Sequence, residues 1–183
     1  MNFMGYRRPD GKAGIRNKVL ILPTCVCSSE TCRIVADQVE GAIYTSNQAG
    51  CSEVEQNLKI CYDMYSGFAA NPNIYGTVLI GLGCEGCTPD KMADAIREKT
   101  NKPLAVVVIQ DEGGTVNAIN KAVKYAREFV QEASLVQKEE IPLSELFIGL
   151  ECGGSDATSG LAANPVVGKV SDLVVDNGGS AVM

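Results

Sequence analysis

The 183-residue sequence contains no histidine and no apolar run long enough to cross a membrane. A membrane-spanning helix needs roughly 18 or more apolar residues in succession, and the residues after Met1 do not form a secretory signal. Without histidine, the chain itself cannot supply an imidazole base, a histidine-dependent triad or a histidine-rich zinc site. We therefore expect a soluble, cytoplasmic protein with no membrane partner. Any metal site in it must use thiolates, carboxylates, backbone oxygens or water.

Positive charge is also scarce, because 16 Lys and Arg residues stand against 22 Asp and Glu residues, for a net charge of −6. An acidic chain argues against nucleic acid as a partner. Residues 1–18 are the exception, with five basic residues and one acidic residue: Arg7, Arg8, Lys12, Arg16 and Lys18 against Asp10. This segment is either a binding region for a small anionic ligand or a solvated basic tail.

Cysteine, in contrast, is abundant, with eight residues in the chain. Cysteines without a secretory signal are expected to be thiols rather than disulfides. Cys32 and Cys61 fall on the apolar faces of predicted helices, so we interpret them as small core residues.

Apolar, β-branched segments alternate with amphipathic helical patterns along the chain. The predicted strands span residues 18–24, 42–45, 76–82, 104–109 and 146–150. Helices are expected after Ser28 or Ser29, after a capping box at 52–55, after Thr88-Pro89 and after Gly114. This alternation predicts an α/β fold, with a three-layer, open, mostly parallel sheet covered by helices on both faces, as in Rossmann-like proteins.

The predicted domain organisation is simple. We expect residues 1–17 to form a basic segment packed on an α/β domain that spans residues 18–183. The chain ends inside an apolar segment at residues 180–183, which suggests that its C-terminus is truncated and that it is a fragment of a larger subunit.

Cysteines follow most of the predicted strands, at the edge where open parallel sheets bind ligands. They are Cys25 and Cys27, Cys51, Cys84 and Cys152, and the last three stand beside glycine. Converging thiolates would suit iron, an iron–sulfur cluster or zinc. Three alternatives stay open: buried packing, nucleotide binding by the G-x-G-x-x-G sequence at 81–86, and a thiol-redox or zinc module built on C-x-x-C at 84–87.

Several motifs together resemble one enzyme family. They are residues 5–17 (GYRRPDGKAGIRN), Pro23-Thr24 with Cys27, Gly50-Cys51, residues 81–85 (GLGCE), residues 151–156 (ECGGSD) and the segment from Ser159-Gly160 to Ala163-Asn164-Pro165. In this order they resemble the altronate/galactarate dehydratase family, which also includes sulfolactate sulfo-lyase large subunits. The resemblance covers nearly the whole chain.

The resemblance implies a lyase. Such enzymes remove water from sugar acids such as altronate or galactarate, or sulfite from sulfolactate. It also implies iron, as Fe2+ or an iron–sulfur cluster, with Mn2+ or Zn2+ as alternatives. The substrate would be a small anionic hydroxy acid, and the partner a small N-terminal-type domain or subunit of the same enzyme, with a homo-oligomer left open. The fragment alone need not be active.

The same resemblance suggests roles for individual residues. Metal ligands would be Cys27, Cys51, Cys84 and Cys152, and Glu85 is the candidate for acid/base catalysis. Substrate-binding residues would be Arg16, Asn17, Gly153, Gly154, Ser155 and Asp156, because a guanidinium can hold a carboxylate through two hydrogen bonds. The sequence departs from the family pattern at Asn47 and Asn71, where family members often carry histidine.

Overall fold

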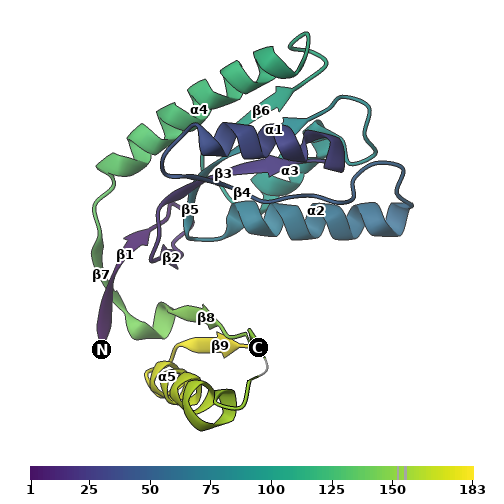
Figure 1. Ribbon diagram of the computed structural model, residues 1–183. Helices are drawn as coiled ribbons and strands as arrows, with labels where there is room; N and C mark the ends of the chain where they lie inside the picture. Colours follow the sequence, from purple (N-terminus) through teal and green to yellow (C-terminus); the bar gives the residue numbers. More distant parts are fainter. Residues whose placement is uncertain (152, 155) are drawn as a thin grey trace.

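The structure is a computed structural model that describes residues 1–151, 153–154 and 156–183. Its centre is a parallel sheet with the strand order β4-β3-β5-β6 (Figure 1). These strands are β3 (Lys18–Pro23), β4 (Ala42–Tyr44), β5 (Ile74–Gly81) and β6 (Leu104–Val108). The α/β fold class predicted from the sequence is thus confirmed.

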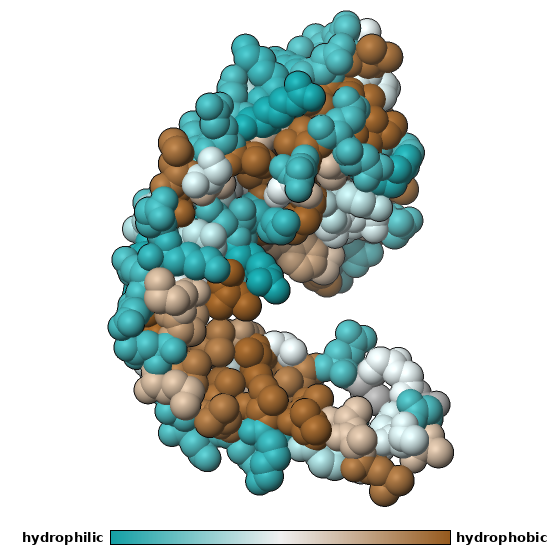
Figure 2. All heavy atoms as spheres, turned by 60° about the vertical axis from the view of Figure 1, so that its left-hand side comes forward, coloured by the Kyte–Doolittle hydropathy of each residue, from teal (hydrophilic) through white to brown (hydrophobic). Residues whose placement is uncertain are grey.

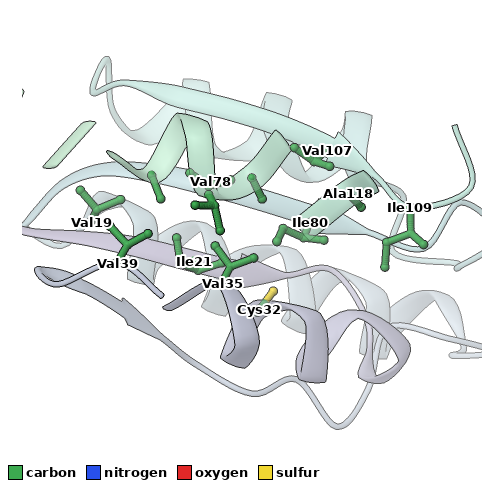
Figure 3. Close-up of a cluster of buried hydrophobic side chains, with 13 residues drawn as sticks. Val19, Ile21, Cys32, Val35, Val39, Val78, Ile80, Val107, Ile109 and Ala118 are labelled. Carbon is green, nitrogen blue, oxygen red and sulfur yellow. The ribbon is translucent and has the colours of Figure 1, made fainter. Parts of the chain in front are cut away.

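Helices cover both faces of this sheet because its strands are apolar on both sides. Val19 and Ile21 of β3 pack with α1 (Val26–Asp37) and α4 (Thr115–Leu135), in the cluster drawn in Figure 3. Leu20 and Leu22 alternate to the other face, where they pack with α2 (Glu55–Ala70) and α3 (Pro89–Lys99). This two-residue alternation is what places one strand in two hydrophobic cores.

Two helix starts agree with the sequence and two differ. Thr88 and Gly114 are the N-caps of α3 and α4, as predicted. The helix α1 starts earlier, with Cys25 as its N-cap, and the hydroxyls of Ser28 and Ser29 donate back to the Cys25 carbonyl. The predicted capping box at 52–55 does not form, because α2 begins only at Glu55 and no side chain caps it.

The N-terminal residues form strands that the sequence pattern did not indicate. Strand β1 (Asn2–Arg7) pairs antiparallel with β2 (Ala13–Gly14) and with β7 (Glu139–Pro142). The guanidinium of Arg8, only 3% exposed, donates to the carbonyls of Pro72 and Arg16 and to Asn17. Arg7 and Arg8 are therefore used in internal contacts, Arg7 with Glu139 and Glu145.

The C-terminal part corrects one expectation. Strand β8 (Phe147–Gly149), predicted as a fifth strand of the central sheet, instead pairs in parallel with β9 (Ser180–Val182) in a separate two-stranded sheet. Between them lie a π-helical turn (Ser159–Ala163) and α5 (Asn164–Asp176), which has Pro165 in its first turn. A short 3₁₀ turn (Leu143–Glu145) joins β7 to β8 (Figure 1).

Apolar side chains are exposed on this C-terminal part. Figure 2 shows a broad apolar area on the lower half of the molecule. Exposed apolar residues of this part are Phe147, Leu161, Val166, Val170, Leu173 and Val175. No helix among the described residues has the length and apolar character that a membrane span requires.

Candidate functional site

Three loops meet where the central strands end, and we refer to them together as the three-loop site. They are the connection from the end of β3 into the first turn of α1 (residues 23–27), which holds Cys27, and the loops 46–51 and 82–88. Backbone hydrogen bonds join them directly: the amide of Val26 donates to Ala49 at 3.1 Å, and the amide of Cys87 donates to Gly50 at 2.8 Å. The middle loop is therefore held between the other two.

Gly50 makes this close approach feasible. Its φ is +89°, and a Cβ placed there would lie 2.1 Å from the carbonyl oxygen of Thr24. Only glycine combines a left-handed backbone with the absence of a side chain. The glycine next to Cys51 is thus required by the contact between two loops, independently of any ligand.

Asn47 organises the same region from within. Its side chain is fully buried; the amide group donates to the carbonyl of Thr24 at 3.0 Å, and the side-chain oxygen accepts from the amide of Ala49 at 2.9 Å. Asn47 is one of the two positions where family members often carry histidine. Sequence reasoning did not identify it as a loop-organising residue, although an asparagine shortly before a glycine is typical of a tight loop.

Glu85 is buried, with 5% of its surface exposed, and faces its own loop. Its carboxylate accepts hydrogen bonds from Thr24 Oγ1 at 2.5 Å, from the Leu82 amide at 2.9 Å and from the Gly83 amide at 2.6 Å. Burial by itself would raise the pKa of Glu85, but these hydrogen bonds outweigh it and the pKa is lowered. The geometry favours a positioning role, and the acid/base role stays a prediction.

The same hydrogen bonds bear on the G-x-G-x-x-G interpretation. In nucleotide-binding loops, backbone amides point at phosphate oxygens. Here the amides of Leu82 and Gly83 already donate to Glu85. A Cβ on Gly81 would lie 2.2 Å from Pro89, so this glycine serves local packing. The loop therefore provides its own anion, which argues against phosphate binding at this position.

Three of the four predicted metal ligands can be located. Cys27, Cys51 and Cys84 are exposed, in different loops of the three-loop site. The pKa of Cys27 is raised, first by the neighbouring Cys25 sulfur, then by partial burial and by the charges of Cys51 and Cys84. Because the charges of Cys51 and Cys84 act on Cys27, the three thiols lie near one another.

The donor chemistry of these thiols fits iron or zinc. Among residues 1–151, 153–154 and 156–183, however, no three Cys, Asp or Glu side chains are arranged to hold a metal ion. Cys152, the fourth predicted ligand, lies outside the described residues. The metal site therefore stays a prediction that rests on donor type and shared location.

The remaining predicted site residues lie elsewhere. Arg16 and Asn17 precede β3, at the opposite end of the sheet from the thiols; a strand of this length spans about 20 Å. Asn17 accepts from Arg8 and donates to the carbonyl of Ala133 at 2.6 Å, so both ends of its side chain are occupied. The structure thus does not bring this pair together with the cysteines.

Of the residues that follow β8, Glu151 and Asp156 are exposed. Gly153 and Gly154 are exposed, and Ser155 lies outside the described residues. The carboxylate of Asp156 accepts hydrogen bonds from the Thr158 hydroxyl, from the Thr158 amide at 2.6 Å and from the Ser159 amide at 3.1 Å, which lower its pKa. Asp156 therefore caps the turn that follows, and its substrate-binding role stays a prediction.

Comparisons with known proteins give a consistent picture. Residues 5–134 match the protein family described as "D-galactarate dehydratase/Altronate hydrolase, second domain", and residues 143–183 match "D-galactarate/Altronate dehydratase, C-terminal". The chain is 37% identical over 176 residues to "(2R)-sulfolactate sulfo-lyase subunit beta" of Chromohalobacter salexigens, covering 96% of this chain and 44% of that protein.

Two dehydratases are also similar. The chain is 31% identical to "Altronate dehydratase" of Bacillus subtilis, over 99% of this chain and 38% of the relative. It is 30% identical to "Galactarate dehydratase (L-threo-forming)" of Escherichia coli, over 98% of this chain and 38% of the relative. The chain thus spans about two fifths of the length of the curated relatives it matches.

Proposed function

Because this chain belongs to the D-galactarate dehydratase/altronate hydrolase family, we propose that it forms part of a lyase that removes water from a sugar acid such as altronate or galactarate. The family match over residues 5–134 is the observation that carries the proposal. The relatives described above, two dehydratases and a sulfo-lyase, agree with it, since all are named for an elimination reaction.

The chemistry shared by these reactions is the elimination of a substituent from a hydroxy acid. A base removes the proton next to the carboxylate, the substituent on the adjacent carbon leaves with its bonding electrons, and the resulting enol becomes a keto acid. The proton is weakly acidic and hydroxide leaves poorly, so the developing negative charge and the leaving group must both be stabilised. A site with several polar donors and an electrophile suits this reaction.

Removal of sulfite from sulfolactate is the second candidate. It is favoured by one observation, the 37% identity to the sulfo-lyase subunit, compared with 31% and 30% for the two dehydratases. Sulfite leaves more readily than hydroxide, so the two reactions differ mainly in the assistance that the leaving group needs. The same three-loop site would serve either reaction.

We further propose that Cys27, Cys51, Cys84 and Cys152 hold a metal ion, first of all iron as Fe2+ or in an iron–sulfur cluster, with Mn2+ or Zn2+ as alternatives. Three of these thiols are exposed in neighbouring segments, and the charges of Cys51 and Cys84 help to raise the pKa of Cys27, which supports the assignment. When bound, such an ion would polarise a substrate oxygen. Glu85 and Asn47 would contribute by holding the loops that carry the thiols.

A second subunit or domain is also proposed. The sulfo-lyase relative is named a subunit beta, which supports an enzyme assembled from more than one part. The partner would be a small domain or subunit of the same enzyme, and the substrate a small anionic hydroxy acid.

The activity can be tested with the full-length protein and any small subunit encoded beside it. Altronate, galactarate and sulfolactate are supplied separately, and keto acid and sulfite are measured. We expect keto acid without sulfite from a sugar acid; keto acid with sulfite from sulfolactate alone would establish the alternative instead. No keto acid from any of the three would refute the lyase proposal.

The metal assignment needs a separate measurement. Iron and acid-labile sulfide are determined in protein purified without oxygen, and in the variants Cys84→Ser and Cys152→Ser. Both variants are expected to lose the metal and to lower kcat by about tenfold or more, whereas Gln56→Ala, an exposed residue of α2 outside the three-loop site, keeps both. A metal-free full-length protein would rule out the assignment.

A further inference from the structure

We propose that Cys61 and Cys87 form a reversible disulfide, which ties helix α2 to the loop that carries Cys84. The Sγ atoms of Cys61 and Cys87 lie 3.6 Å apart, and both residues are buried. A disulfide needs a sulfur–sulfur distance of about 2.0 Å, so the two atoms have to approach by about 1.6 Å. Small side-chain rotations achieve a movement of this size.

This pairing differs from both interpretations suggested by the sequence. Cys61 does lie in the core, as predicted, but it has polar partners there. The C-x-x-C pair is not a unit, because Cys84 is exposed whereas Cys87 is buried against Cys61. The tertiary structure therefore gives Cys87 a partner 26 residues away instead of three.

The surroundings make Cys61 the nucleophile of the pair. Its sulfur accepts a hydrogen bond, at 3.7 Å, from the side-chain amide of Asn47, and it lies within hydrogen-bond distance of the Cys87 sulfur. The amide of Asn47 stabilises a thiolate on Cys61. Contact with Cys87, and then with Asn47, lowers the pKa of Cys61 although burial opposes this, while the pKa of Cys87 is raised. Thiolates, not thiols, react with oxidants and disulfides.

Cys61 is buried but borders a pocket through which a small oxidant would approach. Cys61 lines a pocket of about 430 Å³ between residues 46–49 and α2, together with Asn47, Ile60 and Met64. The pocket is large compared with a molecule of hydrogen peroxide. No comparable opening is needed at Cys87, since that thiol reacts only with Cys61.

The oxidant is hydrogen peroxide or another hydroperoxide. The Cys61 thiolate attacks one peroxide oxygen, which breaks the O–O bond, releases hydroxide and leaves a sulfenic acid. The Cys87 sulfur then attacks the Cys61 sulfur and displaces the hydroxyl group, which leaves as water with the proton from Cys87. In sum, two thiols lose two electrons and two protons, and peroxide becomes two molecules of water. A dithiol reverses the step by exchange.

The bond would act on the three-loop site. The Cys87 amide is already bonded to Gly50, and the hydroxyl of Tyr62, next to Cys61, donates to the Gly86 carbonyl at 3.3 Å and accepts from the Thr88 amide at 3.1 Å. A disulfide adds a covalent connection beside these contacts. It therefore fixes the segment 84–87 relative to α2.

Peptide mapping of the full-length protein tests the proposal without any variant. A protease that cleaves after glutamate and aspartate separates the cysteines in question onto peptides 56–63, 64–85 and 86–90. After peroxide treatment, quenching and alkylation, we expect peptides 56–63 and 86–90 to be linked, with the loss of two hydrogen atoms, and dithiothreitol to separate them. Recovery of both as free alkylated thiols, or a link from Cys61 chiefly to another cysteine, would overturn the proposal.

Variants add a second readout. Oxidation should raise the Tm of the unsubstituted protein but not that of Cys87→Ala. The control is Cys32→Ala, which removes a thiol buried elsewhere in the core and should show the same rise in Tm as the unsubstituted protein. Equal Tm shifts in Cys87→Ala and the unsubstituted protein would show that another bond is responsible. Because neither readout measures lyase activity, the disulfide proposal is tested independently of the proposed function.

Discussion

Replacement of Glu85 gives the most direct test of how the three-loop site is built. In Glu85→Ala, the hydroxyl of Thr24 and the amides of Leu82 and Gly83 lose their common acceptor. Each buried donor left unpaired costs about 1–3 kcal/mol. Because water can enter the space and recover part of this, we expect the free energy of unfolding to fall by about 3–5 kcal/mol.

The matched variant Glu85→Gln keeps the size of the side chain and removes its charge. One end of the new side chain is an NH2 group, which cannot accept from an amide, so about one hydrogen bond is lost. We expect a loss of about 1.5–3 kcal/mol, smaller than that of Glu85→Ala. Urea unfolding at about pH 7, followed by circular dichroism, measures both differences.

The dependence on pH distinguishes the charge from the shape of the side chain. The pKa of Glu85 in the folded state lies below its ordinary value of 4.5, so its contribution is complete above that value and is lost as the pH falls through the folded pKa. The difference between the unsubstituted protein and Glu85→Gln should shrink in this acidic range. A loss below about 1 kcal/mol in Glu85→Ala at neutral pH would refute the positioning role.

Two further predictions concern positions whose backbone or charge the fold constrains. Gly50→Ala should lower the free energy of unfolding by about 2 kcal/mol or more, because the added Cβ would collide with a carbonyl oxygen and the backbone has a positive φ. Gly67→Ala, in α2 with open space around it, should raise the free energy of unfolding by up to about 1 kcal/mol. Equal effects of the two substitutions in urea unfolding would contradict this prediction. Lys102 has its pKa lowered to about 8 by burial and then by the nearby Arg8, so the folded state releases a proton before the unfolded state does. Stability relative to Lys102→Met should therefore rise by about 3 kcal/mol between pH 8 and 10.5, and parallel pH profiles of the two proteins would refute this.

The strands and helices of the central sheet were predictable because their signals are local. The apolar, β-branched residues within 18–24, ended by a proline, favour a buried strand, and Thr88-Pro89 and Gly114 mark helix starts by their own backbone chemistry. The strands β1 and β7 were not predictable, since neither contains a continuous apolar run and β7 begins with two glutamates. Their pairing depends on residues more than 130 positions apart.

In the candidate site, too, some features were predictable from the sequence and others depended on the tertiary structure. The sequence by itself determined that cysteines and glycines gather where the strands end, because parallel strands bring their carboxyl ends to one edge. Only the tertiary structure decided which thiols face outward, that Cys87 meets Cys61, and that Arg8 is enclosed by carbonyls instead of binding a ligand. These outcomes depend on long-range packing, which a periodic pattern does not encode.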